Sequence, residues 1–175
     1  MIAPVHREIE KTAEVNQRRV LNSFRKHRVS ESHFYPSYGY GYDDIGRDQL
    51  ELVYADVFGA EAAIVRPQII SGTHAITIAL FGMLRPGDEL LYITGNPYDT
   101  LEEIIGIRGK ENGSLREFGI TYRVVSLKED GQVDWEAVRK AIHERTKVIG
   151  IQRSKGYADR PSFTIKEIGK MVAEV

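Results

Sequence analysis

The sequence predicts an α/β fold in which a mainly parallel sheet follows an N-terminal helical segment. Residues before position 30 show only helical periodicity, whereas from residue 62 onward apolar segments of strand length alternate with segments of helical periodicity. Such alternation is typical of parallel sheets whose strands are joined by helices. The length of 175 residues and the hydrophobic fraction of 42% are those of an ordinary globular domain.

The composition excludes several classes of protein. Lysine and arginine number 24 against 25 aspartates and glutamates, so the chain lacks the basic excess typical of nucleic-acid binders. The absence of cysteine excludes disulfides, thiolate metal sites and a cysteine nucleophile. No stretch approaches the roughly 18 apolar residues of a membrane span, and charges fall within the first 20 residues, where a signal peptide would be apolar. We therefore expect a cytoplasmic protein with neither nucleic-acid nor membrane partners.

The first part of the chain is predicted to be a long helix because its apolar residues recur at helical spacing. These residues are Val5, Ile9, Ala13, Val20 and Phe24. Residues 34–44 form a loop by their content of Tyr, Gly and Pro, and a short helix should follow. Its apolar face is expected to hold Leu50, Tyr54, Val57 and Phe58.

The alternating part is expected to hold four strands and four helices. The strands are expected at residues 62–66, 89–93, 120–125 and 148–151. The helices are expected at 73–84, at 99–107, after Asp134 and after Thr164. The helix at 73–84 is apolar nearly all round, so we expect it to be buried.

The last two helices start at residue types that cap helices. Asp134 is an N-cap residue type, and Thr164 with Glu167 three residues later fits a capping box. The inner faces are expected to hold Trp135, Val138 and Ile142 in one helix, and Ile165, Ile168, Val172 and Val175 in the other. Because the final apolar pattern reaches Val175 without a stop signal, we expect the front portion of a larger protein. The alternative is a small, complete four-stranded domain.

The segment 71–74 (Ser-Gly-Thr-His) lies between a predicted strand and an apolar helix. The first amides of a helix have no internal partner, and the helix dipole favours an anion there. Gly72 would let a ligand approach the backbone, and Thr73 could add its hydroxyl. The alternative is an ordinary helix start with Ser71 as the N-cap. The dinucleotide fingerprint Gly-x-Gly-x-x-Gly is absent, which makes a nucleotide-binding Rossmann domain a weaker interpretation.

Three further segments carry candidate ligand contacts. A tyrosine–glycine run that includes Tyr42 is followed by Arg47, which could clamp a phosphate or carboxylate. Tyr98 and the polar segment 151–162 each follow a strand, and parallel strands present ligands at their carboxyl ends. Tyr98 is therefore placed to stack on a flat ring. For each segment the alternative is an ordinary loop or helix start. The five histidines show no metal-ligand spacing, so no metal site is expected.

Taken together, these segments resemble the aluminium resistance proteins, which are fold-type I pyridoxal-phosphate enzymes related to cystathionine lyases and methionine gamma-lyase. The resemblance runs from about Glu8 to the last residue. The motifs that carry it are residues 40–47, 71–76, 152–157 and 160–162. It implies the large domain of an aspartate aminotransferase-like fold. Residues 59–175 would be the front portion of that domain, and residues 1–58 an arm with the Tyr/Gly-rich loop.

The resemblance also implies roles for individual residues. The phosphate of the cofactor would be bound by Gly72 and Thr73, with His74 in the same segment. Tyr98 would stack on the pyridine ring. Tyr42 and Arg47 would reach the phosphate of a neighbouring subunit in a homo-oligomer. Arg153 and Ser154 would lie near the ring or the substrate carboxylate.

The implied activity is cleavage of a carbon–sulfur bond in a sulfur amino acid. Such an enzyme needs a Schiff-base lysine and an acidic partner for the pyridine nitrogen. Both are expected beyond the chain end, because Lys147 and Lys155 do not occupy the Schiff-base position. This chain alone is therefore expected to be inactive and to bind pyridoxal phosphate weakly or not at all. The alternative is a non-enzymatic α/β module that binds an anionic ligand or a partner.

Overall fold

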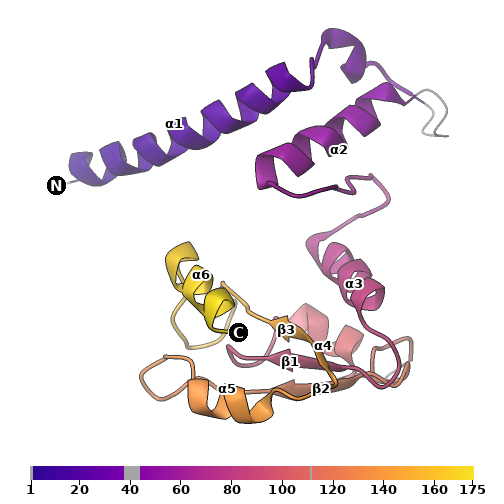
Figure 1. Cartoon of the computed structure of the whole chain (residues 1–175), viewed down its shortest axis with the longest axis vertical. Helices are drawn as coiled ribbons and strands as arrows, with labels where there is room; N and C mark the ends of the chain where they lie inside the picture. The colour runs from indigo at the N-terminus through magenta and orange to yellow at the C-terminus, as the bar shows by residue number, and fades with distance from the viewer. Residues whose placement is uncertain (1, 38–43, 111) are drawn as a thin grey trace. The chain divides into compact units, whose positions relative to one another are not determined.

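The computed structural model describes residues 2–37, 44–110 and 112–175. The chain divides into two compact units, one up to residue 69 and the other from residue 70 onward. The first unit is helical and the second holds the sheet (Figure 1). Among the described residues, no helix combines the length and the apolar character needed to cross a bilayer.

The first unit confirms the two helices predicted before residue 60. Its elements are α1 (Ala3–Lys26), the 3-10 turn η1 (Glu31–Phe34) and α2 (Ile45–Phe58). The buried hydroxyl of Ser23 on α1 donates to the carbonyl of Val53 on α2 at 3.3 Å. The side of α2 that carries Val53 is therefore the packed one. The face predicted from periodicity is wrong, because its residues Leu50, Tyr54 and Phe58 are exposed.

The second unit contains the predicted parallel sheet. Its strands are β1 (Glu89–Tyr92), β2 (Thr121–Val124) and β3 (Thr146–Gly150), in the order β2-β1-β3. The central strand β1 pairs in parallel with both neighbours, so that Leu91 lies opposite Arg123 on β2 and opposite Ile149 on β3. The mainly parallel α/β fold is thus confirmed.

The strand predicted at 62–66 is wrong. These residues belong to the first unit and pair with no neighbouring strand in the part of the chain that the structure describes. The side chain of Glu51 binds this segment where a strand would have a neighbouring strand. It accepts a hydrogen bond from the backbone N–H of Val65 at 2.9 Å and pairs with the guanidinium of Arg66 at 2.5 Å. The apolar run was strand-like in composition, but a local carboxylate satisfies its backbone donor.

Helices cover both faces of the sheet. They are α3 (Gly72–Met83), α4 (Asp99–Ile105), α5 (Trp135–Ala141) and α6 (Ile165–Glu174). Leu90 and Tyr92 of β1 pack in one apolar cluster with residues of α3 and α4. Leu91 and Ile93 pack in a second cluster with residues of α5 and α6. This alternation follows the period of two along a strand and makes β1 the centre of the core.

The predicted caps are confirmed, whereas the predicted buried faces of α3 and α6 are not. In α5, Val138 is buried as predicted, but Ile142 lies just past the helix and is exposed. Asp134 accepts a hydrogen bond from the N–H of Ala137 at 3.0 Å, and Thr164 and Glu167 form the capping box of α6. The exposed side chains on α3 include Ile76, Ile78 and Met83, and those on α6 include Ile165 and Val172. Met171 with Ile168 supplies the packing face of α6 instead. Periodicity located the helices, but their packed sides depend on which partners are present.

We expect Gly150→Ala to destabilise the second unit. A Cβ atom at Gly150 would lie 2.6 Å from the ring carbons of Tyr92, and that ring is buried in the core. Overpacking of this kind costs roughly 1–3 kcal/mol. The matched control is Gly82→Ala in α3, where a Cβ meets nothing within 4 Å and removal of a helical glycine should add about 0.5–1 kcal/mol. Urea unfolding of both variants checks this, and an unchanged midpoint for Gly150→Ala would contradict it.

Candidate functional site

The carboxyl ends of β1 and β3 are joined by side chains in the loops that follow them. The backbone N–H of Gln152, after β3, donates to the fully buried hydroxyl of Thr94, after β1, at 2.9 Å. The side-chain oxygen of Gln152 accepts from the N–H of Tyr98 at 2.6 Å. Both strand-end segments predicted to carry ligand contacts therefore meet at one edge of the sheet, as expected for parallel strands.

A cavity of about 560 Å³ lies at this edge. It lies among the start of α3, the start of α4 and the loop after β3. Its lining residues are Thr73, Ile76, Tyr92, Tyr98, Thr100, Leu101, Ile151, Gln152, Arg153 and Ser154. Four residues predicted for the site are thus brought together from three separate segments, namely Thr73, Tyr98, Arg153 and Ser154.

The start of α3 combines a capped turn with two available amides. Ser71 accepts a hydrogen bond from the N–H of His74 at 3.0 Å, so it is the N-cap. Within the described part of the chain, the N–H groups of Gly72 and Thr73 donate to no acceptor. A Cβ at Gly72 would meet nothing within 4 Å, which leaves open space above the backbone. The two predicted alternatives, a capped helix and an anion cradle, are therefore compatible at this position.

Two side chains complete the surroundings of this turn. The hydroxyl of Thr73 lies 3.0 Å from that of Thr100, which links the starts of α3 and α4. Nδ1 of His74 is buried and has no hydrogen-bond partner among the described residues. A buried polar atom without a partner is uncommon in folded proteins, and a ligand in this region is one way of satisfying it.

Tyr98 has a defined position at the cavity wall. Its ring stacks on that of Tyr157, with 6.2 Å between the centroids and 28° between the planes. The neighbouring Tyr157 phenol raises the pKa of Tyr98, since two phenolates so close would repel each other. Because the ordinary tyrosine pKa is already about 10, Tyr98 is a neutral phenol at physiological pH.

Sequence reasoning missed the residue that shapes the loop after β3. The guanidinium of Arg160 donates to the carbonyls of Ser154 at 2.5 Å and Gln152 at 3.3 Å. It also lies over the ring of Phe163, 5.7 Å from the centroid. Burial lowers the pKa of Arg160. The motif at 160–162 indicated that this position mattered, but it did not show that Arg160 binds the backbone rather than a ligand.

The remaining two predicted site residues belong to the first unit. Tyr42 lies outside the described residues. Arg47 is in the first turn of α2, where its N–H donates to Asp44 at 3.0 Å and its Nε lies 3.7 Å from the same carboxylate.

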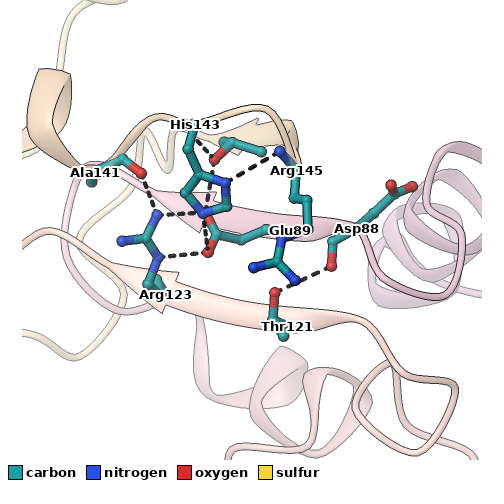
Figure 2. Close-up of polar contacts among 8 residues, drawn as sticks. Asp88, Glu89, Thr121, Arg123, Ala141, His143 and Arg145 are labelled. Carbon is teal, nitrogen blue, oxygen red and sulfur yellow. Dashed lines mark hydrogen bonds and ion pairs between the residues drawn. The ribbon is translucent and has the colours of Figure 1, made fainter.

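A second polar cluster, which the sequence analysis did not predict, lies at the amino end of β1 (Figure 2). Glu89 is 3% exposed, and its carboxylate accepts two hydrogen bonds from the guanidinium of Arg123 on β2, at 2.5 and 2.8 Å. It also accepts from Thr146 of β3 at 2.8 Å and contacts His143 at 3.2 Å. These partners, Arg123 first, lower the pKa of Glu89 to about 2. The cluster ties the three strands together at the edge opposite the cavity.

The whole chain, residues 1–175, matches the family model described as methionine gamma-lyase. A solved structure from Listeria innocua, titled as a candidate cystathionine beta-lyase involved in aluminium resistance, is 62% identical with a TM-score of 0.95 and 99% of this chain covered. A carbon-sulfur lyase involved in aluminium resistance from Clostridium novyi is 46% identical, with a TM-score of 0.92 and 99% covered. The uncharacterised protein YnbB of Bacillus subtilis is 69% identical over 98% of this chain.

The chain spans about two fifths of the length of these relatives. It covers 42% of the Listeria chain and 41% of both the Clostridium chain and YnbB. The family match nevertheless extends over every residue of the chain. The chain therefore belongs to the methionine gamma-lyase family.

Proposed function

We propose that this chain is the N-terminal part of a pyridoxal-phosphate-dependent carbon–sulfur lyase that acts on a sulfur amino acid. The proposal rests on one observation, that the same cavity is lined by Thr73, Tyr98, Arg153 and Ser154. Family membership supports the same conclusion, as do the names of the Listeria and Clostridium relatives. Residues 59–175 would be the front of an aspartate aminotransferase-like large domain, with residues 1–58 as its arm.

The residues present fit the cofactor chemically. A phosphate needs several donors, and the start of α3 offers the amides of Gly72 and Thr73 beside open space. The hydroxyl of Thr73 and the unpartnered Nδ1 of His74 add polar atoms in the same turn. A flat pyridine ring needs an aromatic neighbour, which Tyr98 supplies.

Each residue then has a physical task. Gly72, Thr73 and His74 bind the phosphate, and Tyr98 orients the ring. Arg153 and Ser154 supply a cation and a hydroxyl at the same cavity wall, suited to the ring substituents or to the substrate carboxylate. When bound, pyridoxal phosphate withdraws electrons from the amino acid and so permits loss of the sulfur substituent.

Further parts of the proposal lie outside the cavity. We place the lysine and the acidic residue that engage the cofactor outside these 175 residues, in the part of the relatives that the chain does not span. Tyr42 and Arg47 would contact the phosphate held by a second subunit, so the working form would be a homo-oligomer. Isolated, this chain would bind the cofactor weakly and without turnover. We also propose that the enzyme acts in the cytoplasm.

We expect Tyr98→Ala to weaken binding of 4′-deoxypyridoxine 5′-phosphate by about 5- to 10-fold, the usual order for a lost aromatic stack. This analogue has no aldehyde, so surface lysines cannot capture it. The measurement is a fluorescence titration of the pyridine ring. Tyr98→Phe is the matched control and should bind like the wild type, because the stacking needs the ring and not the hydroxyl. Equal affinity in all three proteins would show that Tyr98 does not stack on the cofactor.

A further inference from the structure

The loop after β3 contacts Tyr98 at both its backbone and its ring. Gln152 accepts the N–H of Tyr98 at 2.6 Å. Gly156 approaches the ring so closely that a Cβ there would lie 2.8 Å from two ring carbons. Tyr157 stacks on the ring at a centroid distance of 6.2 Å. One loop therefore fixes the residue proposed to orient the cofactor.

The start of α4 does not itself fix the side chain of Tyr98. Tyr98 is the N-cap of α4 and makes no side-chain capping bond. It lies in a loop conformation, with φ −59° and ψ 143°, one residue before the helix begins. An aromatic side chain without fixed neighbours loses rotamer freedom when a ligand orders it, and this loss weakens binding. Contacts made beforehand by the loop remove that loss.

The loop is itself held in a fixed shape. The side-chain N–H of Gln152 donates to the carbonyl of Ser154 at 3.1 Å, and Arg160 donates to the same carbonyl at 2.5 Å. The N–H of Phe163 donates to the carbonyl of Arg153 at 3.1 Å, which closes the loop at its base. The ring of Phe163 is buried in the core. The position of the loop is thus coupled to the core of the unit.

Gly156 is required at its position for two independent reasons. Its φ of +56° lies in the left-handed region, which residues with a side chain rarely adopt. The space that a Cβ would occupy is taken by the Tyr98 ring. Tyr157 follows directly and is 90% exposed, so core packing does not explain its place there. Its ring contact is with Tyr98.

We propose that Gln152, Gly156 and Tyr157 are positioning residues that hold the Tyr98 ring against the cavity in the orientation needed to stack on the cofactor. This inference rests on the proposed function, because it assigns how the same site orients its ligand. Tyr157 supports the Tyr98 ring from outside the cavity, since Tyr157 is absent from the cavity lining whereas Tyr98 is part of it. Gln152 fixes the position of the Tyr98 backbone N–H, and Gly156 lets the loop approach the Tyr98 ring closely.

The test compares ligand binding by Tyr157→Ala, Tyr157→Phe and Gly156→Ala with that of the wild-type chain. We expect Tyr157→Ala and Gly156→Ala to weaken binding of 4′-deoxypyridoxine 5′-phosphate by about 3- to 10-fold, which is the size of effect expected when one side chain must be ordered on binding. They should also reduce the induced circular dichroism of the bound pyridine ring. Tyr157→Phe should keep the wild-type affinity and the wild-type dichroism, because it keeps the aromatic ring. Binding of inorganic phosphate should be unchanged in all variants, because the start of α3 is untouched.

The outcomes separate this inference from the proposed function. If Tyr98→Ala weakens the analogue but Tyr157→Ala and Gly156→Ala bind it with wild-type affinity and dichroism, the positioning role is overturned and the cofactor site stands. If Tyr98→Ala itself changes nothing, the stacking role fails and the positioning role fails with it. A parallel loss of phosphate binding in Tyr157→Ala would show general disruption and would contradict the inference. Tyr157 is exposed, so its variants test the proposal even if Gly156→Ala does not fold.

Discussion

Replacing Gly72 with proline is expected to weaken binding of 4′-deoxypyridoxine 5′-phosphate by about 10- to 100-fold, since a hydrogen bond to a charged group contributes roughly 1.5–3 kcal/mol. Proline removes the N–H at the first position of α3, where a helix tolerates proline well. The preceding Ser71 has φ −159° and ψ 165°, an extended conformation that proline accepts in its neighbour. The substitution therefore removes a donor and leaves the helix start intact.

The chain offers a close control for this substitution. Gly72→Ala keeps the N–H, and its Cβ meets nothing within 4 Å. It should bind the analogue within about 2-fold of the wild type, while proline at the same position should not. Calorimetric titration of both variants with the analogue and with inorganic phosphate measures the difference. If the proline variant binds both ligands as the wild type does, the amide of Gly72 is not part of the phosphate site.

Replacing Glu89 with alanine is expected to destabilise the second unit by about 2–3 kcal/mol. A fully buried pair that loses one partner costs roughly 3–5 kcal/mol. The value here should be lower because the side chain of Arg123 is 42% exposed. The control is Glu136→Ala, which breaks a pair of similar length, 2.6 Å to Lys140, on an exposed helix surface. There the loss should be about 0.3–0.5 kcal/mol. Urea unfolding gives both values, and equal losses would contradict the structural role of Glu89.

The same carboxylate gives a defined pH dependence. The pKa of Glu89 is about 2 in the folded chain against an ordinary 4.5, so folding favours its ionised form. Its contribution to stability is therefore complete above the unfolded pKa and is lost as the pH falls from about 5 toward 2. The difference in unfolding free energy between wild type and Glu89→Gln should shrink over this range. A difference that stays constant would show that the ionised carboxylate is not what stabilises the sheet.

Features with a local cause could be predicted from the sequence. Asp134 and Thr164 cap helices through bonds to residues three positions away, so composition and spacing were sufficient. The parallel sheet followed from the alternation of strand-like and helical segments, and the meeting of Tyr98 with Arg153 and Ser154 followed from parallel geometry. These predictions depended on short-range patterns or on a general property of the fold.

Features with a distant cause could not be predicted. The composition of segment 62–66 predicts a strand, but its Val65 N–H donates to the carboxylate of Glu51 instead of to a neighbouring strand. The role of Arg160 depends on which carbonyls its guanidinium meets across a folded loop. Glu89 opens an apolar strand, and its partners come from two other strands and a loop. Sequence spacing does not encode contacts of this kind.

The most direct test of the central claim is a titration of the wild-type chain with 4′-deoxypyridoxine 5′-phosphate, with pyridoxine and with inorganic phosphate as comparison ligands. The account predicts weak but saturable binding of one analogue per chain. The analogue should bind more tightly than either comparison ligand, because the proposed site would contact both its phosphate and its ring, and inorganic phosphate should compete with it. Binding of the analogue no tighter than inorganic phosphate would favour a module that recognises only an anion. No saturable binding of the analogue would contradict a cofactor site formed by Gly72, Thr73 and Tyr98.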